Sequence, residues 1–84
     1  MVNFMRKIKD YIRQDEFKIY LKNNIINIQN FTKIGNVSNF EIIVYNDNQK
    51  IIINGEKLYI KKLLDNEILI IGNYNNIIFE GNNE

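Results

Sequence analysis

Few side chains in this sequence are suited to acid–base or metal chemistry, and three carboxylates in its second half are the first candidates. Glu56, Asp65 and Glu67 lie near one another along the chain. A hard cation needs several convergent oxygen ligands, and no loop around these residues supplies a dense set. The chain has no His and no Cys, which removes the usual general base and the commonest metal ligands. We therefore interpret the carboxylates as solvated turn and strand-edge groups, and expect no enzymatic activity, metal or cofactor.

A second candidate site combines basic and aromatic side chains. Lys57, Tyr59 and Lys61 alternate along one predicted strand, which puts them on the same face. Tyr rings that stack on bases and Lys side chains that neutralise phosphates are typical of RNA binding, and a short helix followed by curved strands is typical of Sm-like RNA-binding rings. The net charge of the chain is only +1, however, and its basic residues are interleaved with acidic ones. A solvated sheet face is the favoured interpretation, and a ring-forming RNA-binding module is the alternative.

The N-terminal residues predict an amphipathic helix over 1–14, because apolar side chains recur there at spacings of three and four while basic ones lie on the other sides. Such a helix would dock on an anionic membrane surface or in a groove of a membrane partner. Alternatively, it would pack over the sheet and complete the core, and the two roles are compatible. The apolar stripe of this helix, a candidate interaction surface, consists of Phe4, Met5, Ile8, Tyr11 and Ile12.

From residue 17 onward the apolar period changes to two, which predicts strands with one buried face. The pattern indicates a mainly β domain over residues 17–80, with about six or seven short, mostly antiparallel strands in a small sheet or roll. Residues 29–39 look like a loose connection, and 81–84 like a loose tail. The clearest alternating strands contain Phe17, Ile19 and Leu21, and then Phe40, Ile42 and Val44.

Two glycines are interpreted as turn residues between short strands. Gly55 follows Asn54, and Asn-Gly between apolar runs is a strong hairpin signal, while Gly72 is expected to separate the last two strands. On the reverse face of the predicted hairpin, Ile52 and Tyr59 are our candidate contact residues. The core face of the hairpin would carry Ile51, Ile53, Leu58 and Ile60.

The length of 84 residues indicates one domain with a small core, so self-association or a partner surface is expected to add stability. The absence of Cys excludes a disulfide framework. No apolar run approaches the roughly 20 residues of a membrane span, and the N-terminus lacks the apolar core of a signal peptide. We therefore expect a soluble domain on the cytosolic side.

The C-terminal third also carries a pattern that resembles a known family. An apolar residue before Gly55-Glu56 is followed by Leu58, Ile60, Glu67-Ile68, Ile70, Gly72 and Ile77-Ile78-Phe79. Together with Ile26 to Asn30, Phe40 and Ile42, this pattern is similar to the YabP/YqfC family of bacterial sporulation proteins over residues 17–80. The basic stretch from Arg6 to Arg13 favours the YqfC branch, whereas Gln29 stands where an acidic residue is common in the family.

The resemblance implies a non-enzymatic role in endospore formation, on the mother-cell side of the developing spore envelope. It also implies a membrane protein encoded nearby as the partner, and no catalytic residues. We therefore predict a small structural β module that forms homo-oligomers and contacts a protein partner, and that does not bind nucleic acid. Any contact with the membrane would be peripheral and made through the N-terminal helix.

Overall fold

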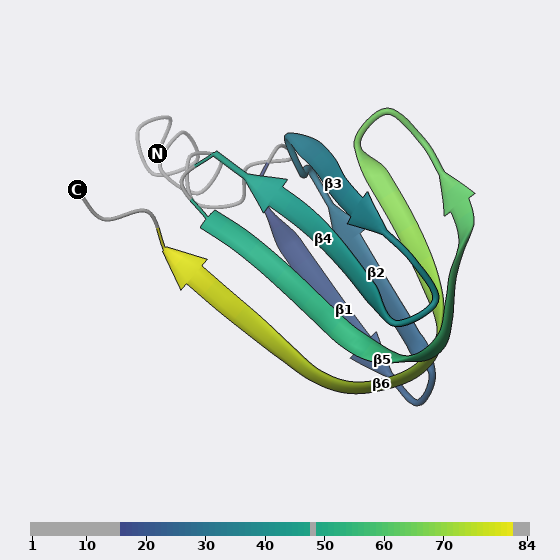
Figure 1. Ribbon diagram of the computed structural model, residues 1–84. Helices are drawn as coiled ribbons and strands as arrows, with labels where there is room; N and C mark the ends of the chain where they lie inside the picture. The colour runs from purple at the N-terminus through teal and green to yellow at the C-terminus, as the bar shows by residue number, and fades with distance from the viewer. Residues whose placement is uncertain (1–15, 48, 82–84) are drawn as a thin grey trace, which may run out of the picture.

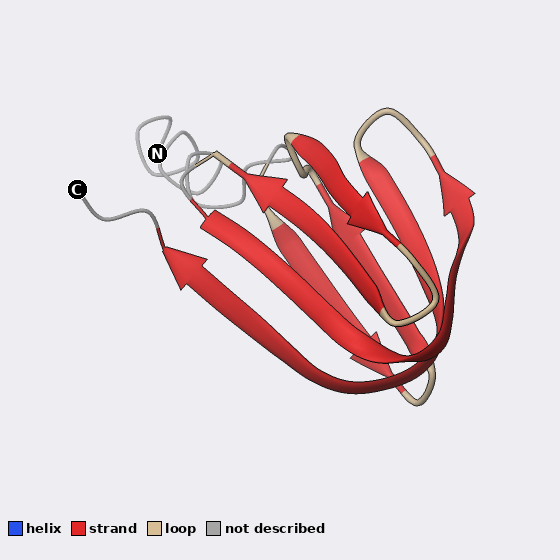
Figure 2. Cartoon of the chain, in the orientation of Figure 1, coloured by secondary structure: helices blue, strands red, loops and turns tan. Residues whose placement is uncertain are grey.

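The computed structural model describes residues 16–47 and 49–81, which form one antiparallel β-sheet of six strands (Figure 1, Figure 2). The strand order across the sheet is β1-β2-β6-β5-β4-β3. This confirms the prediction of a mainly β, antiparallel domain. The predicted helix over 1–14 and most of the predicted tail lie outside the described residues. The strands are β1 (Lys18–Lys22), β2 (Ile25–Gln29), β3 (Lys33–Val37), β4 (Glu41–Asn46), β5 (Gln49–Leu63) and β6 (Glu67–Gly81).

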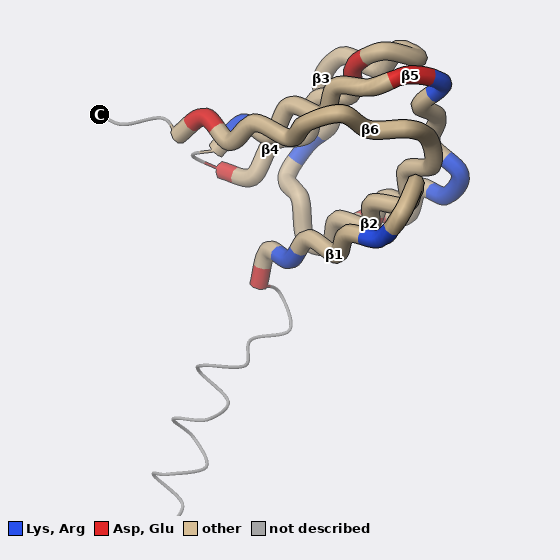
Figure 3. Tube along the Cα trace, turned by 90° about the horizontal axis from the view of Figure 1, so that it is seen from below, with Lys and Arg blue, Asp and Glu red and all other residues tan. Residues whose placement is uncertain are grey.

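Two long strands, β5 and β6, form the centre of the sheet and determine its shape. Each is 15 residues long, and Figure 1 shows that both curve strongly along their length. β4 pairs only with the first part of β5, before β5 bends. β2 pairs only with the first part of β6, before β6 bends. Because β5 and β6 are antiparallel, these two pairings lie at opposite ends of the β5–β6 hairpin. The sheet therefore folds over into two half-sheets, which Figure 3 shows facing one another.

The core lies between the two half-sheets and is made of side chains from alternating positions. Successive residues of a strand point to opposite faces, so every second apolar residue of β2, β4, β5 and β6 points inward. This confirms the predicted burial of Ile51, Ile53 and Leu58, while Ile60 is half-buried against the same cluster. In the described part of the chain, nine apolar side chains are buried: Ile26, Ile28, Ile42, Val44, Ile51, Ile53, Leu58, Ile68 and Ile70.

The predicted hairpin turn at Asn54-Gly55 is wrong, because β5 runs through both residues without a break. Gly55 is needed for a different reason, which is the close approach of β6. A Cβ atom added at Gly55 would lie 2.2 Å from the carbonyl oxygen of Asn73 and 2.7 Å from the Cα atom of Tyr74. The absence of a side chain thus lets the two long strands cross closely where they bend.

The predicted strand break at Gly72 is also wrong, since β6 continues from Glu67 to Gly81. Gly72 has a φ angle of 144°, and it faces an irregularity in β5 where Lys57 has a φ angle of 57°. A Cβ atom on Gly72 would lie 2.7 Å from the carbonyl oxygen of Lys57 and 2.8 Å from the Cα atom of Leu58. Lys57 and Leu58 of β5 thus lie opposite the single residue Gly72 of β6, which is a β-bulge. Bulges increase the local bend of a sheet.

Two further predictions differ from the structure. The stretch 29–39 was predicted to be a loose connection, but it contains the edge strand β3, which pairs with β4 and has an irregularity between Ile34 and Val37. Phe40 was placed on the buried face with Ile42 and Val44, yet it is 69% exposed because β4 begins one residue later, at Glu41. Phe40 instead belongs to the turn between β3 and β4, which leaves its ring in solvent.

Candidate interaction surface

Three isoleucines lie side by side on the outer face of one half-sheet, across β4, β5 and β6. Ile43 is directly opposite Ile52, and Ile52 is directly opposite Ile78. Ile78 is 42% exposed, while Ile43 and Ile52 are half-buried because each side chain partly covers its neighbours. The outer face of an antiparallel sheet is usually polar when it faces water. We call these three residues the isoleucine row.

Polar side chains border the isoleucine row on both sides. Toward one end of the strands, Tyr45, Lys50 and Glu80 form the next cross-strand row. Toward the other end, the Nδ2 atom of Asn54 donates a hydrogen bond of 3.0 Å to Oδ1 of Asn76. An apolar centre with a polar rim is the usual composition of a protein–protein interface.

β3 is the edge strand of this half-sheet and lies beside β4, at the end of the isoleucine row. A Cβ atom added at Gly35 in β3 would lie 2.8 Å from the ring of Tyr45 and 3.3 Å from a methyl group of Ile43. Because Gly35 has no side chain, these two residues lie directly against the β3 backbone. At the start of β3, the Nζ atom of Lys33 lies 4.9 Å from the centre of the Tyr45 ring, in a cation–π arrangement. At Gly35, therefore, no β3 side chain stands between Ile43 and the edge of the half-sheet.

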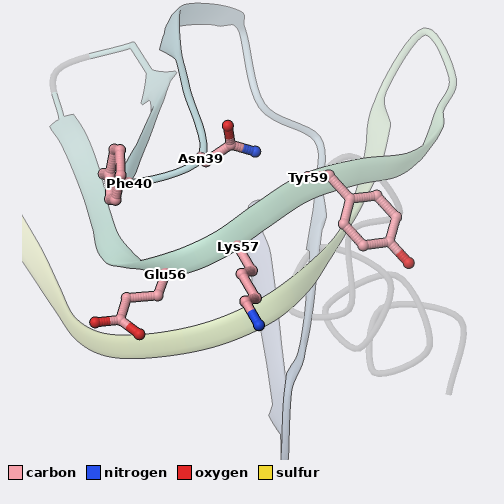
Figure 4. A pocket seen from close by; sticks show the side chains of 5 residues that line it. All are labelled: Asn39, Phe40, Glu56, Lys57 and Tyr59. Atoms are coloured by element: carbon pink, nitrogen blue, oxygen red, sulfur yellow. The ribbon is translucent and has the colours of Figure 1, made fainter.

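A recess of about 630 Å³ lies next to the start of β4, where the β3–β4 turn meets the bulge of β5 (Figure 4). The turn is attached to β5 through Asn39, whose carbonyl oxygen accepts a hydrogen bond of 2.9 Å from the backbone N–H of Leu58. The Nδ2 atom of Asn39 donates a second bond, of 3.2 Å, to the carbonyl oxygen of Leu58. The recess is lined by Asn39, Phe40, Glu56, Lys57 and Tyr59.

The side chains around this recess point apart. Figure 4 shows Glu56 and Lys57 directed away from one another, and Tyr59 pointing away from Phe40. Two aromatic rings are thus available from different sides, with Phe40 69% and Tyr59 51% exposed. The recess offers apolar contact area to a partner molecule rather than polar groups that converge on one atom.

The structure places the two predicted contact residues of β5 on different parts of the outer face. Ile52 is the centre of the isoleucine row, whereas Tyr59 lies beyond the bend and opposite Ile71. The sequence-based prediction did not include Ile43 and Ile78, although Ile43 stood in a strand whose other face was already assigned to the core. The apolar stripe of the predicted helix lies outside the described residues.

The basic and acidic candidates are not assembled into a site among the residues that the structure describes. Lys57 lies in the bulge, so the regular alternation that would align it with Tyr59 and Lys61 is interrupted. No group of three or more potential metal ligands is found in 16–47 and 49–81. Of the carboxylates, Glu67 accepts a hydrogen bond of 2.9 Å from the Nδ2 atom of Asn27.

No helix in the described part of the chain is long and apolar enough to cross a membrane. Comparison of the whole chain with known proteins found no matching family model, no matching curated protein and no matching solved structure.

Proposed function

We propose that this chain is a non-enzymatic β module that assembles with itself and with a membrane-protein partner during construction of the bacterial spore envelope. The observation that supports assembly is the isoleucine row, an apolar strip on a sheet face that would otherwise be polar. Its position on three adjacent strands gives a continuous apolar strip against which another protein can pack. The exposed rings of Phe40 and Tyr59 add apolar area next to the β5 bulge.

The link to sporulation rests on the resemblance of residues 17–80 to the YabP/YqfC family. The residues that carry it include Gly55 and Gly72, together with the apolar residues Leu58, Ile60, Ile70 and Phe79. In this chain the two glycines permit the close crossing of β5 and β6. The resemblance therefore concerns residues that shape the scaffold, and it points to the process in which the scaffold acts. The proposed location is the mother-cell side of the envelope, with peripheral membrane contact through residues 1–14.

A complementation experiment tests this proposal in the source organism. The gene is deleted, and full-length wild-type, Ile52→Thr and Ile71→Thr chains are returned to the strain. Both isoleucines are half-buried on an outer face of a long strand, but only Ile52 belongs to the isoleucine row, so Ile71→Thr is a matched control. We expect deletion to lower the yield of heat-resistant spores and Ile71→Thr to restore it. Ile52→Thr should fail to restore it while accumulating to the same level.

Two results would contradict the proposal. Unchanged spore yield in the deletion strain would remove the sporulation role. Full restoration by Ile52→Thr would remove the isoleucine row as the surface through which the module acts. Immunoblots of both variants show whether each chain accumulates, which separates a loss of binding from a loss of folding.

A further inference from the structure

We propose that a second copy of this chain pairs with the unpaired edge of β6, over residues 73–81, in an antiparallel arrangement across a two-fold axis. We call this segment the β6 edge. The inference specifies the self-assembly that is part of the proposed function, and in that sense rests on it. It identifies both the surface and the partner, which is the same segment of another molecule.

The β6 edge has a strand neighbour on one side only within the described residues. On the side away from β5, pairing with β2 ends where Ile71 lies opposite Ile25. One more hydrogen bond, of 3.1 Å, runs from the backbone N–H of Gly72 to the carbonyl oxygen of Asn24. Beyond it, residues 73–81 pair with β5 alone. Such an edge presents a row of backbone donors and acceptors that another strand can use.

Among the residues that the structure describes, the sheet has three other open edges, and the β6 edge differs from them in its charge. Natural proteins often place Lys on edge strands to prevent unwanted pairing. The β6 edge contains no Lys, Arg or Pro, and Glu80 is its only charged residue (Figure 3). The other open edges all carry lysines, namely Lys18 and Lys22 in β1, Lys33 in β3, and Lys57, Lys61 and Lys62 in the second half of β5.

The sequence of the β6 edge is complementary to itself in one register. With the two-fold axis at Ile78, this residue faces its own copy, Ile77 faces Phe79 of the second molecule, and Asn76 faces Glu80. Apolar side chains then meet apolar side chains on both faces, and like charges are not opposed. Moving the axis to Phe79 places Ile78 against Glu80, and moving it to Ile77 places Ile78 against Asn76. The axis at Ile78 is therefore the favoured one.

This pairing also covers apolar side chains that the isolated sheet leaves in solvent. Phe79 is 52% exposed although it shares the inward face with the buried Ile51, and Ile78 is 42% exposed on the outer face. In the dimer the isoleucine row of one molecule continues into that of the other, which doubles its length. Because both molecules use the same edge, the contact closes as a dimer and does not propagate into a filament.

A cysteine cross-linking experiment tests the register, because the wild-type chain contains no Cys. Residues directly opposite each other in an antiparallel pair have Cα atoms about 4.5–5.5 Å apart, which lies within the range of a disulfide. Full-length Ile78→Cys is therefore expected to form a covalent dimer under mild oxidation. Val37→Cys is the matched control, since Val37 is 46% exposed and lies on the β3 edge. We expect cross-linking at least about ten-fold faster at position 78 than at 37.

Charged variants test the same contact without a covalent bond. Sedimentation velocity of the full-length chain should show a wild-type dimer, and monomers for Ile78→Lys and for Ile78→Glu, because each would oppose like charges across the axis. An equal mixture of these two variants should regain the dimer, whereas Val37→Lys should leave it intact. Far-UV circular dichroism of each variant shows that the sheet is retained.

The proposal is overturned if the wild-type chain is a monomer at every concentration tested, as it would be if another segment of the same chain covered the β6 edge. It is equally overturned if positions 78 and 37 cross-link at the same rate, or if mixing the two charged variants restores nothing. A monomeric wild-type chain would also remove self-assembly from the proposed function. The proposed partner binding and the role in spore formation would stand, because both are measured separately through Ile52→Thr.

Discussion

The close crossing of β5 and β6 at Gly55 predicts a large loss of stability for Gly55→Ala. The added methyl group would lie 2.2 Å from the carbonyl oxygen of Asn73. A carbon and an oxygen that are not bonded approach to about 3.3–3.6 Å, so the overlap is roughly 1 Å. Both atoms that the methyl group would strike, the Asn73 oxygen and the Tyr74 Cα, belong to the backbone and cannot rotate away. One of the two long strands must therefore move.

The cost of this movement is estimated from measurements on overpacked cores. Inserted methyl groups typically cost about 1–3 kcal/mol, and more where the surroundings cannot relax, so we expect at least roughly 3 kcal/mol. The reduced entropy of the unfolded chain returns only about 0.4–1 kcal/mol for Gly→Ala. Since m values of small proteins in urea are about 1–3 kcal/mol/M, the midpoint of unfolding should fall by roughly 1–3 M.

Urea unfolding followed by far-UV circular dichroism measures this change, and Gly35→Ala is the control. A Cβ atom at Gly35 would lie 2.8 Å from the ring edge of Tyr45, which is the end of a side chain and can turn aside. We expect Gly35→Ala to change the free energy of unfolding by less than about 1 kcal/mol. If Gly55→Ala were no more destabilising than Gly35→Ala, the close crossing of the two strands would be refuted.

Three further predictions follow from burial, hydrogen bonding and charge. Ile53→Ala removes a fully buried side chain and should cost about 2–5 kcal/mol in thermal or urea unfolding, and a loss below about 1 kcal/mol would contradict the core assignment. Tyr74→Phe removes a hydrogen bond of 2.9 Å to the carbonyl oxygen of Lys22, and should cost about 0.5–1.5 kcal/mol by the same assay; no change would show that this bond adds no stability. The full chain should not retain RNA even at low salt, and retention lost on changing Lys57 and Tyr59 would instead favour the Sm-like alternative.

The alternation of apolar residues was sufficient to predict most strands and their buried faces. Ile51 and Ile53, for example, were assigned to the core from the period of two alone, and both are fully buried. This success has a simple physical reason, because a sheet with one covered face must place every second side chain inward. The pattern is local, so it can be read from the sequence without knowledge of strand order.

The sequence was misleading where a local turn signal conflicted with long-range pairing. Asn54-Gly55 is typical of a hairpin, but the pairing of β5 with β4 and β6 keeps the chain extended there. Gly35 lies in the stretch 29–39 that was predicted to be a loose connection, yet it is part of β3. At Gly35 and Gly55 the absence of a side chain serves close packing, by a ring in one case and by a neighbouring strand in the other.

The interaction surface was predicted only in part because it depends on the register between strands. Ile52 was identified from its position on the reverse face of β5, which is local information. That Ile43 and Ile78 lie on either side of it follows from the pairing of three strands, and their separation along the chain gives no indication of this. A surface that crosses strands thus becomes visible only once the register is known.

The most direct test of the central claim is the dissociation constant between the purified full-length chain and the detergent-solubilised membrane protein encoded beside it. Titrations would compare the wild-type chain with Ile52→Thr and Ile71→Thr. Removing apolar contact area at the centre of the isoleucine row should cost about 1.4 kcal/mol or more, which weakens binding at least about ten-fold, whereas Ile71→Thr should bind like the wild type. Equal affinity of all three chains, or no binding of the wild type, would contradict the account.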